Sequence, residues 1–571
     1  AAARPCATCA RPSTASPRRS PPNWYNRGRL RAALLASVVG FGLCAFFGAG
    51  LIRSAGPTYD EPVHLSAGYT DLVRGCCRLN ALDHPPLAEM WAVLPLLALK
   101  PDVFPAHPAW LDARVYGYGD LFLFGNRVGP DKLLSVARIF NLLTLSLLLS
   151  LGVAWWAYRL GGLPASLGSA VALGLCVPWF SNAALVTTDA LSAALFFSAF
   201  AVLAPYPRSL GRWVAAGCCV GGALSAKFNM ILLPPFVVVC LLAEARAVKT
   251  ACRDVRGGLA AAAAAALILA LVYGPATPSL WWKGLHATLS RLSEGRSAFL
   301  HGAHSTTGWW WYFPAAVLLK TPLALLAASA LGVWSLRRQP RREAAWLLLP
   351  PVFYMVVALT SKTQIGYRHV LPIYPFLVLL AGLGAAELWR RGRGGRFAAL
   401  ALAAWGAFSV LRGHPHHLAY FNELAGGREG GARWLADSNL DWGQDLPGLA
   451  AELGGRGNPV VVLSYFGSDD PAARGLRYVP LAFISNLARP GNAALEKGAP
   501  VLLAVSQTNR TGVYFRDKSL FAWLESRAPV ASPGGSIFLY DLTADADGRS
   551  RLAALLAASG RPGDAKTLMI H

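Results

Sequence analysis

Two adjacent carboxylates, Asp60 and Glu61, follow the first long apolar run of the chain, which covers residues 30–52. Ionisable groups near a membrane boundary are costly to hold, so by default they indicate a functional site. A carboxylate in such a place can act as a general base, because it can accept the proton of an incoming hydroxyl or amine. The alternative is a solvated loop in which Thr58 or Asp60 caps the helix that follows.

Further polar side chains extend this group along the chain. His64 comes one helical turn after Asp60, and Asp83 and His84 precede a Pro-Pro-Leu sequence. Much later, Asp189 ends the sequence Thr-Thr-Asp and begins another apolar run. Asp189 is therefore a second boundary carboxylate that could face Asp60 across a cavity. The alternative is again a helix N-cap.

Cations near the same boundary supply the complementary chemistry. The polar segment 361–369 contains Lys362, Arg368 and His369 between two apolar runs, and Lys227 and Lys320 lie beside other apolar runs. Arg binds phosphate oxygens with its planar fork, and Lys binds them as a point charge. These residues predict a site for a lipid-linked phosphate. The alternative is that the long side chains extend toward lipid headgroups.

The composition indicates which elements must position these residues. The chain has 571 residues, of which 54% are hydrophobic and 15% are charged, whereas soluble domains carry about 25% charged residues. This composition predicts a polytopic membrane protein. The net charge of +23 does not indicate nucleic acid as a partner, because the basic residues occur in short clusters between apolar runs.

About eleven membrane helices are predicted if each span needs about 20 apolar residues. The expected segments are 30–52, 133–157, 164–182, 189–204, 212–226, 229–243, 258–274, 313–336, 345–360, 370–388 and 397–412. Basic residues cluster in the tail 1–29 and in alternate later loops, so these parts are expected to be cytoplasmic. The first loop, 53–132, and the C-terminal part then lie on the opposite side of the membrane. Within that loop, the stretch 62–74 could lie on the membrane surface as an amphipathic helix.

The C-terminal part, residues 413–571, differs from the rest because it is polar and rich in glycine. Apolar runs at 459–463, 501–505 and 537–540 predict buried strands, and 445–453 and 519–526 predict helices. We therefore expect a small extracytoplasmic α/β domain of about 150 residues. Asp437, Asn439 and Asp441 alternate as at the start of a calcium loop, but no glutamate completes the motif. A polar site that faces the membrane cavity is the preferred interpretation of this segment.

The order of these motifs resembles the GT-C membrane glycosyltransferases. Asp60-Glu61 in the first outer loop, His84-Pro85-Pro86-Leu87, Thr187-Thr188-Asp189 and the later segment 366–375 carry the resemblance, which spans roughly residues 30–412. This family includes protein O-mannosyltransferases, the aminoarabinose transferases of lipid A and bacterial relatives. Membership would imply a multi-pass protein of the bacterial inner membrane. It would also imply a polyprenyl-phosphate sugar donor and inversion at the anomeric carbon.

The resemblance also implies roles for individual residues. Asp60 would be the catalytic base with Glu61 assisting, and Asp189 would match a second acidic position. Lys362, Arg368 and His369 would bind the donor phosphate, and His64, His84 and Lys227 are the other expected substrate-binding residues. The family gives no certain cofactor, and a divalent metal remains possible near Asp60, Glu61, His64 and His84. The acceptor could be a lipid, a polymer or a protein.

Two other classes of protein remain open at this stage. A transporter or flippase for a lipid-linked saccharide would need ionisable residues deep within its helices, whereas this chain keeps most of them at the outer boundary. A catalytically inactive scaffold would use the C-terminal domain to bind a partner, and it would not depend on Asp60 or Arg368.

Overall fold

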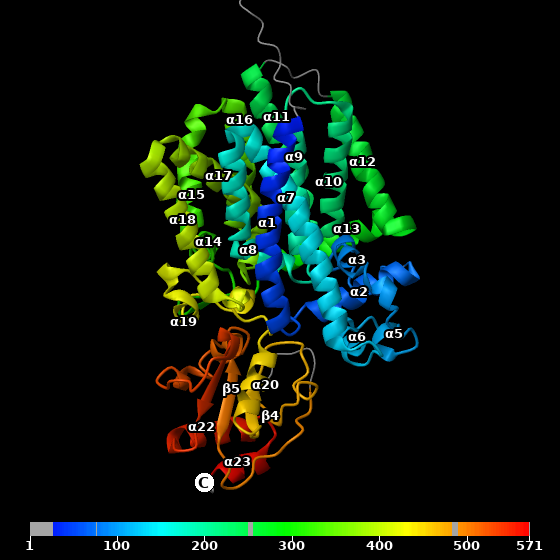
Figure 1. Ribbon diagram of the computed structural model, residues 1–571. Coiled ribbons are helices and arrows are strands. Elements are labelled where there is room, and N and C mark those ends of the chain that lie inside the picture. Colours follow the sequence, from blue (N-terminus) through cyan, green and yellow to red (C-terminus); the bar gives the residue numbers. More distant parts are fainter. Residues whose placement is uncertain (1–26, 76, 249–254, 482–488, 570–571) are drawn as a thin grey trace, which may run out of the picture.

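The computed structural model describes residues 27–75, 77–248, 255–481 and 489–569. Most of the predicted basic tail, 1–29, therefore lies outside the described residues. Long helices run side by side in one bundle, and a smaller α/β unit lies at the end of the bundle where α2, α3 and α6 are found (Figure 1).

Each of the eleven expected segments is largely helical in the structure. The bundle comprises α1 (Arg27–Ser54), α7 (Pro130–Gly174), α8 (Val177–Ala183), α9 (Asp189–Leu203), α10 (Leu210–Ala226), α11 (Leu233–Val248), α12 (Val255–Tyr273), α14 (Tyr312–Lys320), α15 (Leu323–Ser335), α16 (Arg341–Ala358), α17 (Tyr374–Arg390) and α18 (Gly392–Gly413). The range of α7 contains the expected segment 133–157 and the first part of 164–182, which separate at Gly162. Gly162 has φ 72°, a left-handed conformation that glycine adopts without steric cost.

Within the described ranges, six helices are long and apolar enough to cross a membrane. A seventh span results if α14 and α15, which meet at a bend of 111°, count as one. The helices α9 and α10 are apolar but shorter. The structure thus has several apolar helices of membrane-spanning length, and the count of eleven crossings stays a prediction.

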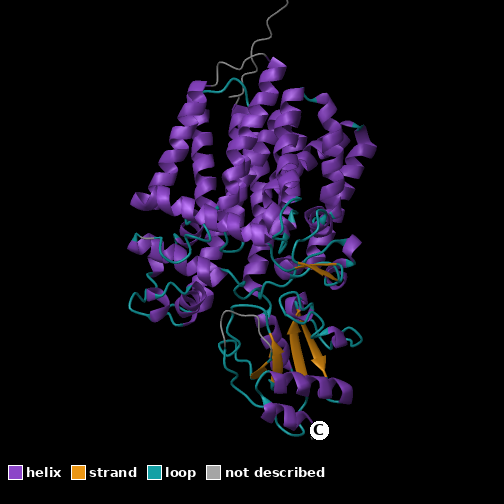
Figure 2. Ribbon diagram, turned by 180° about the vertical axis from the view of Figure 1, so that it is seen from behind, coloured by secondary structure: helices purple, strands orange, loops and turns teal. Residues whose placement is uncertain are grey.

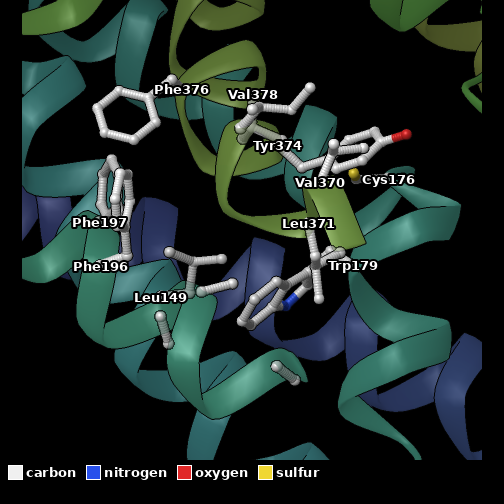
Figure 3. Close-up of a cluster of buried hydrophobic side chains, with 14 of the residues drawn as sticks. Leu149, Cys176, Trp179, Phe196, Phe197, Val370, Leu371, Tyr374, Phe376 and Val378 are labelled. Carbon is white, nitrogen blue, oxygen red and sulfur yellow. The ribbon is translucent and has the colours of Figure 1, made fainter. Parts of the chain in front are cut away.

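The interior of the bundle holds the polar segment that carries Arg368. This segment is the 3-10 helix η4 (Tyr367–Ile373), and its residues Val370 and Leu371 are fully buried. Figure 3 shows both side chains in the same apolar cluster as Trp179, Phe197 and others. In that cluster the ring of Phe197 packs 5.3 Å from the ring of Phe376 on α17. Because the core holds η4 by its apolar side chains, the position of Arg368 is well defined.

The first loop, 53–132, folds into α2 (Glu61–Arg74), α3 (Leu87–Val93), α4 (Leu96–Leu99), α5 (Pro108–Leu111) and α6 (Val115–Phe124). The expected helix over 62–74 is confirmed, but its predicted place on the membrane surface is wrong, because α2 is buried from Glu61 to Asp71. It packs against α3 and α6. A Cβ atom at Gly68 would lie 2.4 Å from the backbone of Glu89, so the close approach of α2 and α3 needs a glycine there.

After α12 the chain forms α13 (Thr277–Glu294) and a hairpin of β1 (Ala298–Leu300) and β2 (Ala303–Ser305). The C-terminal part contains β3 (Val461–Ser464), β4 (Tyr478–Pro480), β5 (Leu502–Ser506) and β6 (Ile537–Asp541). These strands form one sheet in the order β4-β3-β5-β6, in which only β5 and β6 pair antiparallel. Figure 2 shows the sheet with helices around it.

The three predicted strands and the first predicted helix of this part are confirmed, the helix as α20 (Leu446–Gly455). The predicted helix over 519–526 is wrong, because only a single 3-10 turn, Ala522–Leu524, forms there. The strand β4 and the helices α19 (Gly427–Gly431), α21 (Gln507–Arg510), α22 (Ala546–Ala558) and α23 (Pro562–Met569) were not predicted. Ion pairs between Arg474 and Asp131 and between Arg489 and Asp120 join this unit to the bundle and the first loop.

Candidate active site

Arg368 lies between the two boundary carboxylates that the sequence singled out. Its Nη2 atom is 3.4 Å from Asp60 Oδ2, and its Nη1 atom is 3.5 Å from Asp189 Oδ2. Asp60 immediately precedes α2, Asp189 begins α9 and Arg368 lies in η4. Three segments that are far apart in the sequence therefore meet around one guanidinium group. Asp60 occupies the N-cap position of α2 but makes no side-chain capping bond, so its carboxylate is available to the site.

A segment of the C-terminal part holds Arg368 from the other side. Arg368 Nε donates to Ser438 Oγ over 3.1 Å, and the guanidinium lies 4.1 Å from the centroid of the Trp442 ring. Asn439 Oδ1 accepts a hydrogen bond from the backbone nitrogen of Tyr367 over 2.9 Å. The segment 437–445, expected to face the membrane cavity, thus contacts the predicted phosphate-binding residue.

A second part of the site consists of Lys227, Asp189 and His369. Lys227 Nζ forms an ion pair with Asp189 Oδ1. One buried polar atom here, His369 Nε2, has no hydrogen-bond partner among the described residues, whereas Asp189 Oδ2 has Arg368 Nη1 as its ion-pair partner. Buried polar groups are normally satisfied, and exceptions need an explanation such as a missing ligand. The unfilled His369 nitrogen therefore points to a polar ligand beside Arg368 and Lys227.

His64 and His84 lie together, with their ring centroids 5.1 Å apart. His64 Nδ1 is 2.7 Å from Glu89 Oε1, and Asn80 Nδ2 donates to the same oxygen over 2.6 Å. Burial by itself lowers the pKa of His64, but the Glu89 carboxylate outweighs it and the net shift is upward. Burial, with help from the charges of His64 and Lys227, lowers the pKa of His84 well below its usual value. His84 is therefore neutral beside the cations, and the unpredicted Glu89 orients His64.

Glu61 occupies a different environment from Asp60. Its side chain is 0% exposed and pairs with Arg138 of α7, whose side chain is 1% exposed. Oε1 accepts from Arg138 Nε over 2.8 Å and from the Val186 nitrogen over 2.9 Å. Oε2 accepts from the Thr58 nitrogen, from Thr58 Oγ1 and from Arg138 Nη2.

Five donors thus surround two oxygens that together offer about four lone pairs. Burial alone would raise the pKa of Glu61, but Arg138 and the backbone donors lower it. This geometry favours a structural role for Glu61 over the predicted assistance in catalysis. Arg138 was missed by the sequence reasoning, although a lone arginine inside the predicted span 133–157 was a usable signal, because charges within a span need a partner.

Lys362 does not join the other predicted residues. Its side chain is exposed, and Nζ donates to the Ser293 carbonyl over 3.3 Å. A cation that was not predicted, Arg296, lies near Asp60 instead. Burial by itself lowers the pKa of Arg296. The negative charges of Tyr514, Asp437 and Asp60 raise this pKa by more than burial lowers it, so the net shift is upward. Nothing in the sequence of its loop distinguishes Arg296 from other surface cations.

The described residues contain no group of three or more His, Cys, Asp or Glu side chains arranged to hold a metal ion. The site is thus a cluster of carboxylates, imidazoles and cations at one end of a bundle of apolar helices. By its fold, the protein is of the helical class whose apolar helices are long enough to cross a membrane.

Comparison with known proteins gives matches among solved structures. No protein-family model and no curated protein matches the chain. ArnT from Cupriavidus metallidurans, in a crystal structure bound to undecaprenyl phosphate, is 17% identical with a TM-score of 0.46, over 90% of this chain and 98% of that chain. The apo structure of the same ArnT is 15% identical with a TM-score of 0.46, over 90% and 97% of the two chains. At this identity and TM-score, we base the function proposed below on the residues of this chain.

Proposed function

We propose that the protein is a membrane glycosyltransferase that moves a sugar from a polyprenyl-phosphate donor to an extracytoplasmic acceptor, with inversion at the anomeric carbon. One observation carries this proposal: Arg368 contacts both Asp60 and Asp189 at the end of the apolar bundle. Sugar transfer from a phosphate needs a base for the acceptor and cations for the leaving group, and these groups are adjacent here.

Asp60 fits the role of the base. Its side chain is 24% exposed, and its contact with Arg368, at 3.4 Å, is long for a charged hydrogen bond. An acceptor hydroxyl can therefore approach the carboxylate without first breaking a strong interaction. Proton transfer to a positioned side chain contributes about 10²–10⁴-fold to a rate.

Arg368 and Lys227 fit the role of leaving-group stabilisers. The donor is a phosphodiester with one negative charge, whereas the departing polyprenyl phosphate is a monoester with about −1.5 to −2. Negative charge therefore grows on the phosphate as the reaction proceeds. Cations beside it stabilise the transition state more than the bound donor, which is the condition for faster chemistry. His369 Nε2 is buried without a partner among the described residues, which supports a contact of His369 with the same phosphate.

The reaction is a single displacement. The acceptor oxygen attacks the anomeric carbon from the face opposite the phosphate, and the bond from that carbon to the phosphate oxygen breaks. The acceptor proton passes to Asp60, and the bonding electrons leave with the phosphate. One displacement at the anomeric carbon inverts its configuration.

A transporter is the second candidate, because it too would bind a lipid-linked saccharide. The position of the charged cluster, where η4 and the starts of α2 and α9 meet, favours the enzyme. A transport route would instead need ionisable groups along the length of the bundle.

The test uses full-length protein in membranes with radiolabelled polyprenyl-phosphate sugars. The variant is Asp60→Asn, and the matched control is Asp112→Asn, which changes an exposed acid whose ion-pair partner in the described structure is Arg114. Transfer that is lost in the first variant and kept in the second supports the proposal. Equal transfer in both moves the base to Asp189. A wild type that transfers no sugar but moves labelled lipid across the bilayer would replace the enzyme with the transporter.

A further inference from the structure

A polar cavity of about 470 Å³ lies where the β1–β2 hairpin meets the C-terminal part. Its lining includes five basic or imidazole side chains and one acid. These are His301, His304, Arg433, Arg510, Lys518 and Glu525. The volume lies within the roughly 300–1,000 Å³ that small-molecule sites occupy. The cavity is thus large enough for a sugar-sized ligand, and its walls carry net positive charge.

The cations of this cavity have no carboxylate partners within the described ranges. Within the described ranges, Arg433, Arg510 and Lys518 form no ion pair. Three other arginines of the C-terminal part each pair with an aspartate, namely Arg474, Arg489 and Arg527. Unpaired cations that converge on one cavity repel each other, so an anionic ligand there would relieve a cost that the fold leaves uncompensated.

Two of these cations are fixed in place before any ligand binds. Arg510 donates through Nη1 to Gln507 Oε1 over 3.2 Å, and its guanidinium lies 4.8 Å from the centroid of the Phe538 ring. Lys518 Nζ donates to Ser297 Oγ over 3.1 Å and to the Val513 carbonyl over 2.6 Å. Positioned cations lose less side-chain entropy on binding than mobile surface side chains do.

Arg510 also has an unused donor. Its Nε atom is buried and has no hydrogen-bond partner among the described residues. A guanidinium binds phosphate and carboxylate groups through pairs of N–H donors. Arg510 lines the cavity and has no carboxylate partner within the described ranges, so its guanidinium points to an oxyanion as the ligand.

The cavity is built onto the same segment that holds Arg368. Gln507 Nε2 donates to the Ala432 carbonyl over 2.6 Å, and both residues line the cavity. The next residue, Thr508, donates from its backbone nitrogen to Asp441 Oδ2 over 2.8 Å. Asp441 is next to Trp442, on which Arg368 stacks. A ligand in the cavity would therefore lie against the segment 437–445, which contacts Arg368 at the proposed transfer site.

We infer that this cavity binds an acidic saccharide, a sugar that carries a phosphate or a carboxylate, as part of the acceptor. The acceptor role rests on the proposed function. The binding itself does not, because it follows from the cations and the cavity alone.

Equilibrium binding to the purified full-length protein in detergent tests the site. Glucose 6-phosphate and glucuronate are the two anionic probes, and glucose is the neutral control. At least one anionic sugar binds the wild type, glucose does not, and the stronger probe tells whether phosphate or carboxylate is preferred. Arg510→Gln weakens binding by about 10-fold or more, as expected when a charged hydrogen bond is lost. Arg433→Gln, a change at an exposed position, acts in the same direction without risk to the fold.

The matched control is Arg516→Gln, which removes an exposed arginine that does not line the cavity. Binding of glucose as tight as that of the anionic sugars, or equal weakening by Arg516→Gln and Arg510→Gln, overturns the inference.

The rate at which the enzyme hydrolyses the donor with water, without acceptor, measures catalysis alone. Comparing it with the transfer rate therefore tests the acceptor role by itself. Under our inference, Arg433→Gln and Arg510→Gln keep the rate of donor hydrolysis and raise the KM for an acidic acceptor by about 10-fold. An equal fall in hydrolysis and transfer would show a structural effect and overturn the acceptor role. If the wild type cleaves no donor but still binds acidic sugars, the proposed function fails and the binding site stands.

Discussion

Asp60 and Glu61 are neighbours in the sequence, yet their carboxylates have opposite environments. Glu61 is fully buried and surrounded by five donors, whereas Asp60 is 24% exposed with one long contact to Arg368. A buried and saturated carboxylate builds structure, because moving it would leave Arg138 unpaired. A carboxylate with spare capacity is free to react. The number of unfilled bonding positions therefore separates the two roles better than the residue type does.

The Glu61–Arg138 pair also determines where the reactive groups lie. Glu61 binds Val186, three residues before Asp189, and it directly follows Asp60. Arg138 adds bonds to the carbonyls of Ala55 and Gly56, each over 2.8 Å. The pair thus joins the loops that carry both site carboxylates to α7.

The largest effect is expected from Asp60→Asn, which removes the proposed base and keeps the size of the side chain. Transfer should fall by about 10²–10⁴-fold, while the thermal midpoint of unfolding should stay at the wild-type value. Initial rates with labelled donor and unfolding scans in detergent measure the two quantities. A large fall in the midpoint would mean that Asp60 is a structural residue like Glu61.

Glu61→Gln should give the opposite result. It leaves the Arg138 guanidinium buried without its carboxylate, which costs about 3–5 kcal/mol of folding free energy. A lower thermal midpoint and less folded protein are the expected readouts. The double variant Glu61→Gln/Arg138→Gln should recover part of the loss, because it removes the unpaired charge. A single variant that unfolds like the wild type but transfers no sugar would restore Glu61 to the catalytic residues.

Arg368→Lys tests whether the planar fork is needed, since one ammonium cannot reproduce contacts to Asp60, Asp189, Ser438 and Trp442. Loss of a hydrogen bond to a charged group costs roughly 1.5–3 kcal/mol, so kcat/KM for the donor should fall by about 10–150-fold. Most of the fall should be in kcat, because Arg368 is proposed to stabilise the charge that grows on the leaving phosphate. Steady-state kinetics with varied donor concentration measure this change. An unchanged kcat with a raised KM would limit Arg368 to donor binding.

A third acid, Asp441, extends the comparison, because its pKa makes the stability of the fold depend on pH. Burial raises the pKa of Asp441 to about 7, against about 3.9 in an unfolded chain. The folded state therefore holds this proton more tightly, so its contribution to stability is complete below about pH 4 and is lost as the pH rises through 7. Between about pH 5.5 and 8 this loss is on the order of 2 kcal/mol.

Asp441→Asn should make the thermal midpoint less sensitive to pH over this range. Unfolding scans of both proteins across the range measure the difference. Identical slopes for wild type and variant would contradict a raised pKa for Asp441.

The smallest effect is expected from Lys362→Gln. Lys362 is exposed, and among the described residues its side chain donates only to the Ser293 carbonyl. Its replacement should change the KM for the donor by less than about twofold, the scale of surface substitutions. A larger rise would show that Lys362 reaches the donor phosphate, as the sequence predicted.

The meeting of Asp60, Asp189 and Arg368 was foreseeable because alternating apolar runs place their loops at the same end of the bundle. The strands β3, β5 and β6 were foreseeable for a similar reason, since each is a short apolar run between turn residues. The particular pairs formed inside the fold were not foreseeable. Arg138 and Glu61 are 77 positions apart, and no local pattern relates them. The helix α22 was missed because its polar first turn hides the apolar residues that it buries.

Lys362 and Arg296 show the same limit within the site itself. Both are exposed cations in loops, and residue type alone cannot tell which one has Asp60 among the charges that act on it. The orientation depends on Tyr514, over whose ring the Arg296 guanidinium lies at 5.0 Å. Tyr514 belongs to the C-terminal part, whose place beside the loop is a property of the tertiary fold.

The supports of Arg368 come from residues 438 and 442, which are synthesised after all the apolar helices. Lys320, buried at the bend between α14 and α15, also donates to the carbonyls of Leu418 and Asn439. A growing chain whose helices are already in place therefore still lacks the groups that orient its central cation. The proposed transfer would begin only when the segment 437–445 has left the ribosome and folded onto the helices, so an unfinished chain would not consume the proposed donor.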